Sequence, residues 1–403
     1  MVAATSKAAP AGQTSYNIIL AVSAAHLIND VIQFLLPALY PLLKVNYELD
    51  YFQIGLLTLA QQITACVLQP LMGLYGDVRP KPYMLAVSLT IVAAGVLLLA
   101  TANSFPLLLV AAIVLGTGSA LFHPEASRVA RLASGGRLGF AQSAFQVGGN
   151  AGTALGPLAA ALIVLPLGQM STIWFGLVAV LGIMVLTYVG RWYSGHQRLA
   201  AGRPAVAPLK PAISRNRLIV AFTVIGALLL SKYVYIETFK SYYTFYLIEK
   251  FELPVQDAQI FLFLFLGAIA VGTFFGGPIG DRFGRLAVIW GSIVGALPFA
   301  LAMPYANLWG TAALSIAVGL ILSSAFSAIV VYAQELVPGK VGMVAGFVFG
   351  FAFGIGAIGA AVLGALADQI GIVAVFGLCS FLLFLGFLTI FLPKSADLYG
   401  RHP

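Results

Sequence analysis

Long apolar stretches separated by short polar segments occupy almost the whole chain. Twelve of them have about the length of a membrane-spanning helix, which needs about 20 mainly apolar residues. They cover roughly 17–43, 51–75, 83–102, 106–126, 139–164, 172–191, 218–247, 258–279, 286–304, 310–334, 342–367 and 372–393. The pattern therefore predicts an all-α integral membrane protein with twelve transmembrane helices.

The longest polar stretch, 192–217, contains several prolines and basic residues and divides the chain into two halves. We expect an N-terminal six-helix half at 1–191, a cytoplasmic linker at 192–217 and a C-terminal six-helix half at 218–403. A repeat supports this division, because Gly73 and Asp77 recur as Gly277 and Asp281. Two similar halves are typical of transporters that bind their substrate between the repeats.

Composition narrows the class of protein further. The 403 residues are 61% apolar and only 8% charged, too little polar surface for a soluble enzyme. With the N-terminus placed inside, all but four of the 21 Lys and Arg residues fall on the inner side. The net charge of +8 then reflects topology and not a nucleic-acid partner. We expect a multi-pass protein of the cell inner (plasma) membrane with both termini cytoplasmic.

The cysteines and histidines are too few and too scattered for catalytic chemistry. Cys66 and Cys379 lie in apolar runs, and the four histidines show no metal-ligand spacing. We therefore predict no enzyme activity, no metal site and no cofactor.

The first span carries four polar residues on one helical face: His26, Asn29, Asp30 and Gln33. Asp30 lies about 20 Å from the helix start, near the middle of the bilayer. A charged side chain there costs at least about 2.5–3.5 kcal/mol, so it marks a functional site by default. Asp30 and His26 are thus candidate proton carriers, with Asn29 and Gln33 as substrate contacts. The alternative is an Asp30 that is permanently hydrogen-bonded to a neighbouring helix.

The fourth span ends with His123, Glu125 and Arg128. Glu125 and Arg128 are three residues apart and can form an ion pair on one helix face. Two interpretations remain open here. His123 and Glu125 form a proton or substrate site, or Glu125 and Arg128 form a cytoplasmic latch that controls gating.

Spans five and seven supply candidate substrate contacts. Gln142, Gln146 and Asn150 recur every four residues and form an uncharged hydrogen-bonding stripe. The alternative is that they join helices, each bond being worth about 0.6 kcal/mol. Lys232 has no acidic residue three or four positions away, so an anionic substrate would supply its counter-charge. Tyr235 and Tyr242 on the same span suit a mixed polar and apolar cavity.

Several motifs resemble those of the major facilitator superfamily. The segment from Gly277 to Arg285, with Asp281, Arg282 and Gly284, is similar to the complete loop motif of that superfamily. The first-half copy keeps Gly73, Asp77 and Lys81, with Pro80 in place of a glycine. The resemblance implies that these loops latch one state of the transport cycle.

Longer segments resemble the drug exporters of that superfamily, among them 26–30, 122–131, 141–150, 241–247 and 331–336. The resemblance implies proton-coupled efflux (drug:H+ antiport) of fosmidomycin-like phosphonate antibiotics, or related small anionic compounds, by alternating access. The implied partners are a small-molecule substrate, protons and the lipid bilayer, and we expect a monomer. The alternative is uptake or facilitated transport of a small anionic metabolite, such as an organic or phosphorylated acid.

Overall fold

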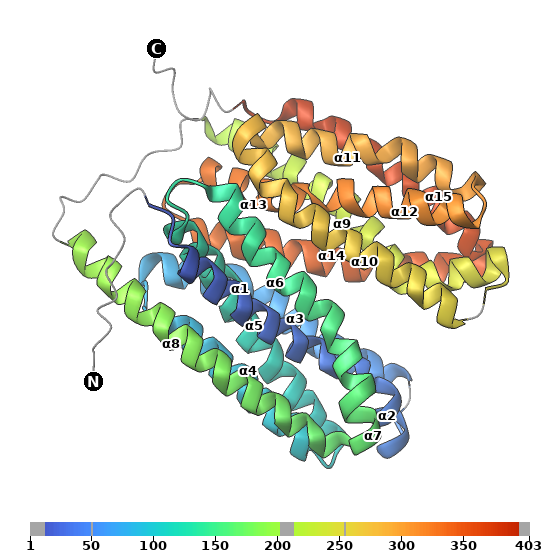
Figure 1. Ribbon diagram of the computed structural model, residues 1–403, viewed down its shortest axis with the longest axis horizontal. Coiled ribbons are helices and arrows are strands. Elements are labelled where there is room, and N and C mark those ends of the chain that lie inside the picture. The colour runs from blue at the N-terminus through green and yellow to red at the C-terminus, as the bar shows by residue number, and fades with distance from the viewer. Residues whose placement is uncertain (1–12, 50, 202–212, 254, 395–403) are drawn as a thin grey trace. The chain divides into compact units, whose positions relative to one another are not determined.

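The computed structural model describes residues 13–49, 51–201, 213–253 and 255–394, and helices dominate this part of the chain (Figure 1). The α-helices are α1 (Tyr16–Ala38), α2 (Tyr40–Asn46), α3 (Tyr51–Val78), α4 (Met84–Thr101), α5 (Phe105–Ala133), α6 (Leu138–Ala159), α7 (Leu165–Leu167), α8 (Ile173–Ala201), α9 (Arg215–Phe251), α10 (Val255–Phe283), α11 (Arg285–Ala302), α12 (Leu308–Ser323), α13 (Ala325–Leu336), α14 (Val341–Ile370) and α15 (Ile372–Phe381). A π-helical turn spans Ala160–Val164, and 3-10 helices span Gln169–Thr172, Met303–Tyr305 and Leu382–Phe391.

The helices form two compact units. The first comprises 1–209 and 339–350, and the second 210–338 and 351–403. In the first unit α1 packs along α6, while α5 packs along α3 and α4, and α4 also contacts α8. In the second unit α10 and α11 pack on α12, and α9 packs on α15 and on the segment 382–391. The first turns of α14 therefore belong to the same unit as α1 to α8.

Eleven helical segments of the described chain are long and apolar enough to cross a membrane. The expected fifth span, 139–164, is helical as α6 and the π-helical turn, but it does not meet that criterion. Its Gln142, Gln146 and Asn150 lower the mean hydropathy of the helix. A count of twelve spans therefore stays a prediction.

Some elements differ in extent from the sequence pattern. The expected linker is helical at both ends, because α8 continues to Ala201 and α9 begins at Arg215, while 202–212 lies outside the described residues. The tenth expected span is divided into α12 and α13 at Ser324. The Ser324 hydroxyl donates to the Ile321 carbonyl oxygen, and such back-bonding competes with helical hydrogen bonds.

A row of glycines brings α6 close to α1. A methyl group at Gly148 would overlap the backbone of Ser23, and one at Gly152 would lie 2.9 Å from Asp30 Cβ. A methyl group at Gly156 would likewise lie 2.7 Å from Phe34 Cβ. In a membrane, small residues let helices approach closely where no hydrophobic force joins them. This contact sets the position of the polar face of α1.

Candidate functional site

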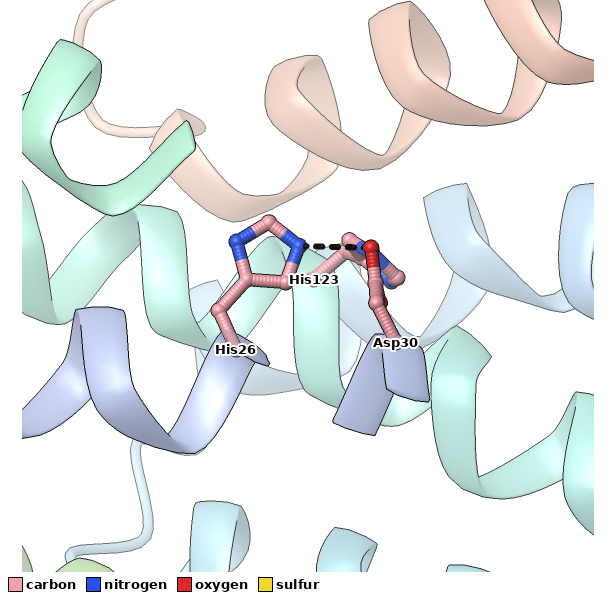
Figure 2. A group of neighbouring side chains, drawn as sticks. All are labelled: His26, Asp30 and His123. Atoms are coloured by element: carbon pink, nitrogen blue, oxygen red, sulfur yellow. Dashed lines mark ion pairs between the residues drawn. The ribbon is translucent and has the colours of Figure 1, made fainter. Parts of the chain in front are cut away.

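Three titratable side chains converge inside the first unit (Figure 2). Asp30 and His26 come from α1 and are one turn apart, and His123 comes from α5. The Asp30 carboxylate oxygens lie 3.4 Å from His26 Nε2 and 3.7 Å from His123 Nε2. The two imidazole ring centroids are 5.1 Å apart. We call these three residues the His–Asp–His cluster.

Backbone carbonyl groups orient both imidazoles of the cluster. His26 Nδ1 lies 2.8 Å from the carbonyl oxygen of Phe145, and His123 Nδ1 lies 3.0 Å from that of Ser119. A carbonyl oxygen only accepts, so each Nδ1 carries a hydrogen and donates it. Each Nε2 is then turned toward Asp30. Two imidazole nitrogens and a carboxylate, all acceptors when the rings are neutral, thus face one another.

The cluster is shielded from solvent. His26 and His123 are buried, and the Asp30 side chain keeps an exposed fraction of 11%. Gly149 of α6 lies against the His26 ring so closely that a methyl group there would overlap it. Phe122 and Phe145 flank the His26 ring with centroids at 5.7 and 4.1 Å. A cation inside the cluster is therefore held away from bulk water.

The other polar residues of α1 are also buried. Asn29 donates its amide to Asp30 Oδ1 at 2.8 Å. Gln33 donates to the carbonyl oxygen of Leu115 at 2.9 Å, and its own side-chain oxygen accepts from Gln61 at 2.8 Å. Gln33 therefore joins α1 to α3 and α5, and its role as a substrate contact stays a prediction.

The amides of α6 lie in the same unit as the cluster. The Gln142 side-chain oxygen accepts from the hydroxyl of Ser127 on α5 at 2.9 Å. Both Gln142 and Gln146 are buried, whereas Asn150 is half-buried. Gln142 thus also joins helices, while the side-chain oxygen of Gln146 has no hydrogen-bond partner among the described residues.

Lys232 lies at the middle of α9, in the second unit, with only 1% of its surface exposed. Its ammonium group has no hydrogen-bond partner among the described residues. It lies 5.7 Å from the centre of the Phe326 ring, whose π-face attracts a cation weakly. A buried ammonium group without a hydrogen-bonding partner is costly, so it favours an anionic ligand.

The tyrosines of α9 have different surroundings. Tyr235 is buried against Phe239, which in turn stacks on Phe265 at 4.3 Å. Tyr235 therefore packs in an aromatic core of the second unit, and its role as a substrate contact stays a prediction. Tyr242 is half-buried. Glu237 and Lys240 pair with each other at 3.2 Å, and each side chain is 30% exposed.

Arg128 forms the centre of a second polar cluster in the first unit. Its guanidinium binds Glu125, Asp77 Oδ1 at 3.0 Å and the carbonyl oxygen of Gly73 at 3.0 Å. Asp77 also accepts from the backbone N–H groups of Gly342 and Met343, at 2.9 and 2.8 Å. These N–H groups belong to the first turn of α14, which a carboxylate caps and stabilises.

The second-half loop motif has a related arrangement within its own unit. Arg285 lies 3.6 Å from Asp281 and 3.1 Å from Glu335. Gly284 adopts a φ of +91°, a conformation that glycine tolerates without strain. The remaining predicted gating residues are Lys81 and Arg282, which are exposed, and Gly277.

The sequence pattern identified the residues of both clusters as candidates, but not which of them contact one another. The scattered histidines gave no reason to expect a metal-type grouping, yet the fold brings His26 and His123 to one carboxylate. The pairing of Arg128 with Asp77, 51 positions away, was also missed. The spaced glycines of α6 were the available signal, because they predict a close approach of another helix.

The sequence model of the protein family called the Major Facilitator Superfamily matches residues 22–247 and 241–401 of this chain. The chain belongs to the major facilitator superfamily. It is 51% identical over 393 residues to the fosmidomycin resistance protein of Escherichia coli (strain K12), covering 98% of this chain and 96% of that protein. It is 42% identical over 397 residues to YfnC of Bacillus subtilis (strain 168), an uncharacterized MFS-type transporter, covering 97% and 96%.

Solved structures of major facilitator superfamily transporters have the same fold. FucP in the outward conformation aligns with a TM-score of 0.72 and 15% identity, over 94% of this chain and 99% of that one. Another structure, of the E. coli fucose:proton symporter FucP, aligns with a TM-score of 0.69 and 16% identity, over 94% of this chain and 100% of that one. The chain is therefore a multi-pass membrane transporter of small molecules, and the prediction of a transporter resembling the fosmidomycin resistance protein is confirmed.

Proposed function

We propose that this transporter exports fosmidomycin-like phosphonates, or related small anionic compounds, in exchange for protons. The His–Asp–His cluster is the observation that carries the proposal. Three acceptor groups facing one another repel unless a cation lies between them. A proton bound by the cluster removes the repulsion, and the buried position keeps that proton from exchanging freely.

The identity of the substrate is supported by two features. The relative that shares 51% of its residues is named for resistance to fosmidomycin, a phosphonate. Lys232 offers a buried ammonium group to an anionic ligand. The other proposed substrate contacts are Asn29, Gln33, Gln142, Gln146, Asn150, Tyr235 and Tyr242.

We further propose that the chain has twelve spans in two six-helix halves, at 1–191 and 218–403, with both termini cytoplasmic and the chain acting as a monomer. In this proposal the substrate and the proton reach their sites alternately from each side of the membrane. Arg128, with its partners Glu125, Asp77 and Gly73, takes part in gating. So do the loop residues Gly277, Asp281, Arg282, Gly284, Arg285 and Lys81.

The test uses purified protein in liposomes with an imposed pH gradient and labelled fosmidomycin. A gradient of one pH unit is worth about 1.4 kcal/mol per proton, which drives about tenfold accumulation. We expect accumulation that collapses when a proton ionophore is added. Equilibration without accumulation would contradict proton coupling and favour facilitated transport of a small anionic metabolite.

A further inference from the structure

The His–Asp–His cluster has the chemical make-up of a transition-metal site. Two imidazole nitrogens and one carboxylate oxygen, all within 4.8 Å of one another, face a common point. The set of two His and one carboxylate occurs in zinc sites that keep one position open. Magnesium and calcium prefer oxygen ligands alone, so this donor set selects against them.

The distances from Asp30 to the two imidazoles are close to those between neighbouring ligands of one tetrahedral ion. Zinc lies about 2.0–2.2 Å from such ligands, which places neighbouring ligand atoms about 3.3–3.6 Å apart. His26 Nε2 lies 3.4 Å from Asp30 Oδ2, and His123 Nε2 lies 3.7 Å from Asp30 Oδ1. Each imidazole is therefore about one ligand-to-ligand distance from one oxygen of the same carboxylate.

The surrounding contacts are those that metal sites use to orient histidine. Each ligating imidazole of a metal site donates its other N–H to a carbonyl or carboxylate. Here both Nδ1 atoms contact backbone carbonyl oxygens, of Phe145 and Ser119, at 2.8 and 3.0 Å. Asn29 adds a hydrogen bond of 2.8 Å to the Asp30 carboxylate. The Asp30 side chain is 11% exposed, so the carboxylate is not fully enclosed.

We propose that His26, Asp30 and His123 form a binding site for one late first-row divalent ion, of which Zn²⁺ and Co²⁺ are the representatives. Water fills the open fourth position. Metal binding by these residues does not depend on whether the chain exports phosphonates.

The test measures Co²⁺ binding to full-length protein that carries no histidine tag, in detergent and in lipid nanodiscs. We expect one equivalent of Co²⁺ with the intense visible absorption of a four-coordinate ion, displaced by Zn²⁺ but not by Mg²⁺. His26→Gln, Asp30→Asn and His123→Gln should each weaken binding at least about 100-fold, because even outer partners contribute 10- to 100-fold.

His196→Gln is the matched control, because His196 stacks on Trp192 of α8 and is not a member of the cluster. This variant should bind Co²⁺ as the unchanged protein does. Thermal unfolding without metal identifies any cluster variant that fails to fold. If a variant fails to fold, the visible absorption of Co²⁺ bound to the unchanged protein is used instead, because it shows whether nitrogen and oxygen atoms ligate the ion. Absence of saturable binding, or binding that all three folded cluster variants retain, would overturn the proposal.

Discussion

At the scale of single residues, the ionisable groups are divided between the two units. The acidic and imidazole groups that suit a proton are in the first unit, and the buried ammonium group of Lys232 is in the second. A proton and an anionic substrate would therefore bind to different residues. This separation allows each site to be tested by a single substitution.

Replacing Asp30→Asn removes the carboxylate that the two imidazoles share. We expect uphill export to be lost while exchange of substrate across the membrane continues, since an amide cannot bind and release the coupling proton. With a gradient of one pH unit, accumulation should fall from about tenfold to none. Full accumulation by a folded Asp30→Asn protein would exclude this residue as the proton carrier.

Replacing Lys232→Ala removes the buried ammonium group. Anionic substrates should bind at least about tenfold more weakly, equal to about 1.4 kcal/mol, and neutral analogues should change little. Competition binding with a charged and a neutral analogue measures this. Lys240→Ala is the control, because its ion pair with Glu237 is partly exposed and such pairs contribute little. Equal weakening of both analogues by Lys232→Ala would indicate a structural role.

At the scale of helices, the contact between α1 and α6 positions the His–Asp–His cluster. Glycines of α6 meet the turns of α1 that carry His26 and Asp30, so the two helices approach more closely than larger residues would allow. Gly152 and Gly156 thus have a packing role in this contact.

Gly152→Ala tests this contact. The added methyl would overlap the Leu27 carbonyl oxygen, so we expect a loss of about 1–3 kcal/mol in stability and weaker uphill export. Thermal unfolding of the purified protein measures the first effect. Gly195→Ala on α8, with open space around it, should instead stabilise the helix by up to about 1 kcal/mol. Equal unfolding temperatures for both variants would show that the glycine row does not control the approach.

At the scale of the whole molecule, Asp77 connects segments that are far apart in the chain. It binds Arg128 of α5 and caps the first turn of α14, 265 residues away from it. Both side chains of the ion pair are buried, with 6% and 8% exposed. Breaking a buried ion pair typically costs about 3–5 kcal/mol, so this contact is strong enough to bias a transport cycle.

Asp77→Ala removes both interactions. Under the proposed cycle, turnover should fall at least about tenfold while substrate affinity stays within about threefold, because Asp77 is not one of the proposed substrate contacts. Initial rates in liposomes and equilibrium binding separate the two quantities. Arg79→Ala, an exposed neighbour, should leave both unchanged. Unaltered turnover in Asp77→Ala would remove the gating role.

Much of the fold was predictable from local pattern alone. Apolar stretches of about 20 residues specify helices in a membrane, because only helices and closed barrels satisfy every backbone polar group there. The same reasoning located Asp30 as unusual, since a charge is expensive at that depth. It counted α6 with its amides as a span, which stays a prediction, and it did not foresee the division of α12 from α13 at Ser324.

By itself the sequence determined the class of protein, the family and the residue types that carry charge in apolar surroundings. Only the tertiary structure decided which of these residues meet. His26 and His123 are 97 positions apart, and Asp77 and Gly342 are 265 apart. Periodicity reports which face of a helix is polar, but it contains no information on which other helix covers that face. That depends on how small residues such as Gly149 and Gly152 allow two backbones to pack, which is a property of helix pairs.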